Sequence, residues 1–128
     1  MSPSTVLLRR ELFDVHGLFD ETLPICEDCD LWLRLTAQHQ VALLSEKLMT
    51  RHGGHADQLS RSDWGIDRYR VQSIIKILKT EKLSPEDRSA AIVALRKKCK
   101  ILINGFHKRG KLQEVEKYEK IANQHQIS

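Results

Sequence analysis

The sequence predicts an α/β fold followed by an α-helical hairpin, and three features support this prediction. Short apolar or β-rich runs at residues 4–8, 41–44 and 47–50 are typical of buried strands. In the second half, apolar residues recur every three or four positions, as in amphipathic helices. The charge also changes, because residues 1–60 carry five Lys/Arg against nine Asp/Glu, whereas residues 61–128 carry sixteen against eight. We therefore expect a mixed domain over 1–62 and a basic helical extension over 63–128.

The elements of the first part follow in order after the strand at 4–8. Residues 9–16 predict a short helix with Val15 on its inner face, and Gly17 is the left-handed residue expected to end it. A second helix is predicted over 27–37 from the spacing of its leucines. Residues 51–61 are rich in Gly, His, Asp and Ser, which predicts a loop at the lip of a site.

The second part is predicted to be helical throughout. Residues 71–78 carry the apolar stripe of an amphipathic helix. Ser84 and Pro85 predict the start of another helix, since Ser caps a helix well and Pro suits its first position. That helix should end near Gly110 and pack against a last helix over 112–125, so that the two form an antiparallel hairpin.

The densest chemical signal is an acidic cluster at the start of the 27–37 helix, formed by Glu27, Asp28 and Asp30. A helix N-terminus stabilises negative charge, so composition alone indicates no more than a well-capped helix. The helical spacing lets Glu27 or Asp30 pair with Arg34 while Asp28 points toward a cleft. A carboxylate held ionised in this way can accept a proton from a bound hydroxyl.

A longer pattern surrounds this cluster. Residues 4–13, Val15, Gly17, 19–21, 27–28 and 30–34 agree in order and spacing with the second half of family-2 inverting glycosyltransferases. Over about residues 2–61 the chain resembles the C-terminal, acceptor-side part of such an enzyme. The resemblance implies the C-terminal portion of a GT-A, Rossmann-like fold. It also implies that the nucleotide-binding half lies upstream, so that this chain alone is inactive, either as a fragment or as a remnant.

The resemblance also implies roles for individual residues. Asp28 is expected to be the general base, and Glu27 to support the acceptor or orient Asp28. Asp30 and Trp32 are expected at the acceptor site, although the helical spacing of Trp32 equally suits a core residue. The loop after the last strands is expected to approach the donor diphosphate or its metal through His52, His55, Arg51 and Arg61.

The expected ligands follow from this chemistry. The enzyme would use a nucleotide-sugar donor, a glycan or lipid-linked acceptor, and a divalent cation (Mg or Mn) that stabilises the departing diphosphate. No signal peptide or membrane-spanning run is present, which predicts a cytoplasmic protein, peripheral at the inner face of the membrane if its basic extension binds lipid. An unpaired strand edge at 4–8 indicates a homodimer.

Two other interpretations stay open. The basic hairpin could be a non-catalytic module that binds a partner or an anionic membrane surface. Nucleic acid is not expected, because aromatic residues are not interleaved with the basic ones.

A zinc site could combine Cys26 and Cys29 with His39, His52 or His55, although no second cysteine pair is present. With Cys99 the cysteines number three, which excludes a fully paired disulfide framework.

Overall fold

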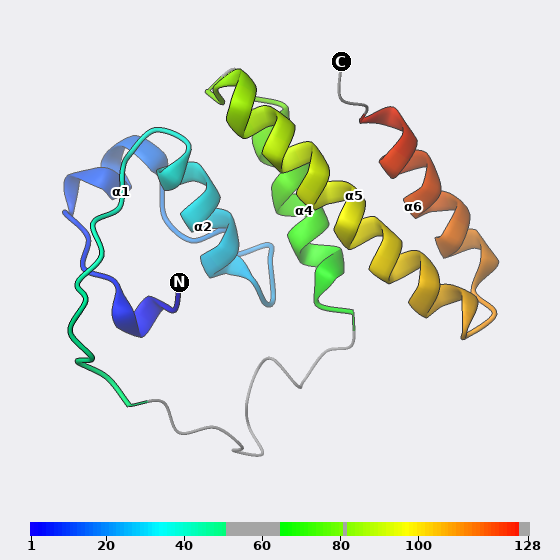
Figure 1. The fold of residues 1–128 in the computed structure, drawn as a ribbon, viewed down its shortest axis with the longest axis horizontal. Helices are drawn as coiled ribbons and strands as arrows, with labels where there is room; N and C mark the ends of the chain where they lie inside the picture. The colour runs from blue at the N-terminus through cyan, green and yellow to red at the C-terminus, as the bar shows by residue number, and fades with distance from the viewer. Residues whose placement is uncertain (51–64, 81, 126–128) are drawn as a thin grey trace.

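The structure is a computed structural model that describes residues 1–50, 65–80 and 82–125. Within these ranges the chain forms α-helices and one short 3-10 helix, and it contains no β-strand (Figure 1). The elements are η1 (Pro3–Thr5), α1 (Glu11–His16), α2 (Glu27–Thr36), α4 (Asp67–Leu78), α5 (Pro85–His107) and α6 (Leu112–Gln124).

The predicted α/β fold is therefore wrong, and so is the C-terminal portion of a GT-A fold that the resemblance implied. Val6 has extended dihedrals, φ −120° and ψ 132°, but no described segment pairs with it, and Leu7 is 99% exposed. Residues 41–50 have no regular structure, and Leu43 is 92% exposed. β propensity alone does not make a strand, because the backbone N–H and C=O groups of a strand need a partner.

The helices are close to their predicted positions. α2 and α6 lie within one residue of the predicted ranges. α5 begins as predicted, since the Ser84 hydroxyl accepts a hydrogen bond from the Asp87 backbone N–H at 3.0 Å and Pro85 is the first helical residue. Gly17 ends α1 with a positive φ of 76°, a conformation that favours glycine.

The larger apolar core belongs to α4, α5 and α6. In Figure 1, α5 lies between α4 and α6, and α5 and α6 run antiparallel. Aliphatic side chains fill the two contacts, and the rings of Phe106 and Tyr118 stack with their centroids 5.6 Å apart. The buried members are Val71, Ile74, Leu78, Ile92, Leu95, Cys99, Leu102, Phe106, Val115 and Tyr118.

A smaller cluster joins α1 to α2. Leu31, Trp32 and Leu35 are buried on α2, and side chains from residues 6–13 pack on them. Val15 was predicted on the inner face of α1, but it is 68% exposed, so that part of the prediction is wrong. α2 also contacts α4 (Figure 1). The predicted division of the chain at residue 62 falls outside the described residues and stays a prediction.

None of the helices in the described ranges combines the length and the apolar character that crossing a membrane requires. The homodimer also stays a prediction, but its expected contact, a strand edge at residues 4–8, is not a strand in this structure.

Candidate functional site

The acidic cluster lies at the N-terminus of α2. Cys26 is the residue before the helix and has a left-handed backbone, φ 65° and ψ 18°. Asp28 is half-buried, and its Oδ1 accepts a hydrogen bond from the Cys29 backbone N–H at 2.7 Å. Glu27 is also half-buried, and neither carboxylate forms an ion pair with a described residue.

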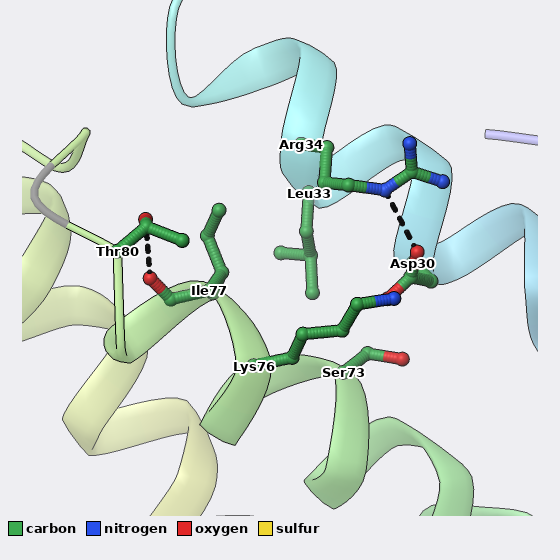
Figure 2. A pocket seen from close by; sticks show the side chains of 7 residues that line it. All are labelled: Asp30, Leu33, Arg34, Ser73, Lys76, Ile77 and Thr80. Atoms are coloured by element: carbon green, nitrogen blue, oxygen red, sulfur yellow. Dashed lines mark hydrogen bonds and ion pairs between the residues drawn. The ribbon is translucent and has the colours of Figure 1, made fainter. Parts of the chain in front are cut away.

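Asp30 is used differently, although it lies only two residues away. Its side chain is 2% exposed and holds two cations at once. Oδ2 accepts from Arg34 Nε at 2.8 Å, and Oδ1 lies 3.1 Å from Lys76 Nζ. Figure 2 shows Arg34 reaching Asp30 along α2 while Lys76 reaches it from α4. A buried carboxylate needs such partners, so Asp30 acts here as a structural anion.

Lys76 extends this network to a third segment. Its Nζ lies 2.7 Å from Asp20 Oδ2, in the loop between α1 and α2. The hydrogen bond from Lys76, together with bonds from Thr22, holds the pKa of the Asp20 carboxyl well below its usual range. Burial opposes the charge on Lys76, but hydrogen bonds to the Asp20 and Asp30 carboxylates outweigh it and raise the Lys76 pKa. The three charged groups therefore fasten α2, α4 and the loop together.

Arg34 fixes the end of α1. It was predicted to pair with Glu27 or Asp30, and the structure confirms Asp30. Its Nη1 donates to the backbone carbonyl of His16, and its Nη2 donates to that of Leu18 at 2.8 Å. A Cβ at Gly17 would lie 3.7 Å from Arg34 Nη1, an ordinary van der Waals contact, so the positive φ and not lack of space favours glycine there. The planar fork of Arg suits this multiple bonding.

Trp32 is a buried residue of the α2 cluster. It is 8% exposed, and its indole Nε1 has no hydrogen-bond partner among the described residues. A buried N–H without a partner costs free energy. Trp32 therefore lies in the core, as its helical spacing allowed. The roles of Trp32 and Asp30 in acceptor binding stay predictions.

Two small cavities lie between the helices of the described structure. One of about 80 Å³ lies between α2 and α4 (Figure 2), and its lining residues are Asp30, Leu33, Arg34, Ser73, Lys76, Ile77 and Thr80. The other, of about 190 Å³, lies between the start of α4 and the second half of α5. Ligand pockets commonly measure about 300–1,000 Å³. Neither cavity has the size that a nucleotide-sugar requires.

The predicted site is brought together only in part. Glu27, Asp28, Asp30 and Trp32 share α2. The predicted diphosphate and metal residues lie outside the described residues; they are His52, His55, Arg51 and Arg61.

The zinc interpretation gains no support from the described ranges, where no group of three His, Cys, Asp or Glu side chains could hold a metal ion. His39, one of its proposed ligands, instead shares a 2.8 Å Nε2–Nε2 hydrogen bond with His16.

The sequence did not reveal the charged partners that join the helices. Lys76 bridges Asp20 and Asp30, and buried Asp67 pairs with Arg70 at 2.9 Å and with Lys98 at 3.0 Å. Helical spacing indicates the Asp67–Arg70 pair, which is three residues apart. No spacing rule connects residues as distant as Lys76 and Asp20, because their contact depends on how α2 docks on α4.

No protein-family model, curated protein or solved structure matches the chain. Together with the helical structure of the described residues, which contain no strand, this result overturns the resemblance to family-2 glycosyltransferases.

Proposed function

We propose that this chain is a portion of an enzyme that transfers a sugar from a nucleotide-sugar to an acceptor hydroxyl with inversion, and that Asp28 is its general base. One observation carries the proposal. The ion pairs around α2 use Asp30, whereas Asp28 stays half-buried at the helix N-terminus without an ion pair to a described residue. A carboxylate of this kind is available for proton transfer.

The chemistry needs one base from this side of the reaction. The acceptor hydroxyl attacks the anomeric carbon, Asp28 takes its proton, and the bond to the nucleoside diphosphate breaks on the opposite face. The positive end of the α2 dipole favours the ionised carboxylate, and Glu27 lies beside Asp28 to bind or orient the acceptor. No group of three candidate metal ligands lies among the described residues, so we assign the expected Mg or Mn to none of them.

The sizes of the two cavities support a division between this chain, which would bind the acceptor, and other parts of the enzyme, which would bind the donor. Because both cavities are smaller than a nucleotide-sugar, we propose that the donor binds to other parts of the enzyme and that a glycan or lipid-linked acceptor lies over the start of α2. Residues 1–128 alone should then show no measurable transfer, and transfer by residues 1–128 alone would contradict this division.

The test is the Asp28→Asn variant of the intact enzyme. We expect kcat to fall by about 10²–10⁴-fold, because the amide cannot accept the proton, while the donor KM changes little. Glu21→Gln is the matched control, since Glu21 is exposed in the loop before α2. Unimpaired turnover of Asp28→Asn would reject the proposed base. A thermal unfolding curve checks that both variants are folded.

A second candidate function is binding to an anionic membrane surface, and the outer face of α5 favours it. Lys97, Lys100 and Lys108 are exposed there, and apolar Val93 and Ile101 lie between or beside them, 54% and 48% exposed. Basic and apolar side chains on one helix face suit a surface of acidic lipid. Such binding would place the protein peripherally at the inner face of the membrane and near a lipid-linked acceptor.

Vesicle co-sedimentation tests this second function. The chain should sediment with vesicles that contain acidic lipid, should stay in solution with neutral vesicles, and should be released at high salt. The double change Lys97→Glu with Lys100→Glu should abolish binding. Lys120→Glu is the control, because Lys120 lies on α6 and already pairs with Glu116 at 2.7 Å. Equal binding to neutral vesicles would exclude an electrostatic membrane contact.

A further inference from the structure

The two cysteines that flank the acidic pair belong to different environments. Cys26 precedes α2 and is 7% exposed, with its Sγ 4.0 Å from the backbone carbonyl of Ile66. Cys29 is half-buried in the first turn. The two side chains are three residues apart where the helix begins, and the thiols interact with each other. Cys26 is the residue before the helix and Cys29 lies in its first turn, so both side chains belong to the N-terminal end of α2.

A cation from another helix faces this pair. The Arg70 guanidinium of α4 lies near the side chains of both Cys26 and Cys29. Burial, with the neighbouring Cys29, raises the pKa of the Cys26 thiol to about 11, so Cys26 stays protonated at neutral pH. Cys29 is the more accessible of the two thiols, and the more accessible thiol reacts first. Cys29 therefore has the position of the attacking sulfur and Cys26 that of the resolving one.

We infer that Cys26 and Cys29 form a reversible intramolecular disulfide by exchange with a low-molecular-weight disulfide. The Cys29 thiolate attacks one sulfur of that disulfide, whose S–S bond breaks and releases one thiol after protonation. Cys26 then loses its proton to solvent and attacks the Cys29 sulfur of the mixed disulfide. The protein disulfide forms and the second small thiol leaves. Two protein thiols are oxidised, and one small disulfide is reduced to two thiols.

The disulfide would close a ring that contains Glu27 and Asp28. Oxidation would hold the first turn of α2 in one conformation and change how these carboxylates meet a ligand. This consequence rests on the proposed function, whereas the thiol exchange does not, so transfer activity is not the readout of its test.

The reduced chain is equilibrated with mixtures of oxidised and reduced glutathione, and acid then stops the thiol exchange. The chain is unfolded, its free thiols are alkylated, and its mass is measured. We expect two of the three thiols to become protected together in the oxidising mixtures, and peptide mapping to join Cys26 to Cys29. Cys99 should stay reduced during the exchange, because it is fully buried in the other core, and it should therefore be alkylated once the chain is unfolded. Cys99→Ser is the matched control and should form the same disulfide.

Single variants identify the order of attack. Cys26→Ser should accumulate a mixed disulfide of Cys29 with glutathione, whereas Cys29→Ser should react much more slowly at the buried Cys26. Three alkylated thiols in the most oxidising mixture would overturn the inference. Equal accumulation of mixed disulfide in both variants would overturn the assigned order. The wild-type result does not depend on whether either variant folds.

Discussion

The two parts of the described structure are held together by different forces. α4, α5 and α6 share a continuous apolar core in which Leu95 and Cys99 are completely buried. α1 and α2 share only a small apolar cluster, to which Arg34 adds bonds to a carboxylate and backbone carbonyls and Lys76 adds bonds to two carboxylates. Apolar burial depends on area and tolerates small shifts, whereas a charge network depends on distance and direction.

This difference indicates where function is to be found. A ligand-binding region needs polar groups that are oriented by their neighbours, and such groups are concentrated around α2. The aliphatic core of α4, α5 and α6 contributes stability instead, and the exposed face of α5 carries basic side chains. Changes in the helical core should therefore alter stability alone, while changes around α2 should also alter pH dependence and chemistry.

The largest effect is expected in the helical core. Leu95→Ala removes a side chain that is 0% exposed and should lower the free energy of unfolding by about 3 kcal/mol. Urea unfolding followed by circular dichroism measures it. Val93→Ala, two residues earlier and 54% exposed, should change stability by less than about 0.5 kcal/mol. Equal effects of the two changes would mean that the face of α5 that carries Leu95 is not buried.

The next largest effect concerns the charge network. Arg34→Lys keeps the charge, but an ammonium cannot bond Asp30 and the carbonyls of His16 and Leu18 together. We expect a loss of about 2 kcal/mol, since each lost hydrogen bond costs about 1 kcal/mol. Hydrogen exchange should accelerate in α1 and α2 and not in α6. Uniform acceleration along the chain would show that the two parts unfold as one unit.

The pH dependence should also separate the two parts. Burial lowers the pKa of His16, and the neighbouring side chains of His39, Lys82 and Arg34 lower it further. The unfolded chain then binds a proton at His16 more readily than the folded chain. Stability is therefore complete above the ordinary His pKa of about 6.5 and is lost as the pH falls through the lowered value.

Unfolding by urea at pH 7.5 and at pH 5.5 measures this loss, with hydrogen exchange locating it in residues 1–40. His16→Gln removes the titrating group and should flatten the dependence. A pH profile that is unchanged in His16→Gln would show that another group titrates.

The smallest effect is expected at Trp32. Trp32→Phe removes an indole N–H that has no partner among the described residues, so the lost packing is offset by the removal of an unsatisfied donor. The free energy of unfolding should change by less than about 1 kcal/mol, as measured by urea unfolding. A loss of several kcal/mol would mean that the N–H is bonded in solution.

The same contrast explains what the sequence could predict. The start of α5 followed from Ser84 and Pro85, and the cores of α5 and α6 from apolar spacing, because these signals are local. The strands at 4–8 and 41–50 were predicted from composition, but a strand depends on a distant partner that local composition does not reveal. Lys76 was missed for the same reason, since only the docking of α4 brings it to Asp30. The acidic cluster was found, but its division between Asp28 and Asp30 required the structure.

That division is the central claim, and urea unfolding of Asp28→Asn beside Asp30→Asn tests it most directly. Asp30→Asn leaves Arg34 and Lys76 without their shared anion and should cost at least about 2 kcal/mol. Asp28→Asn should cost less than about 1 kcal/mol, the contribution of a charge at a helix N-terminus. Equal losses, or a larger loss for Asp28→Asn, would show that Asp28 is a structural residue and would contradict its availability for catalysis.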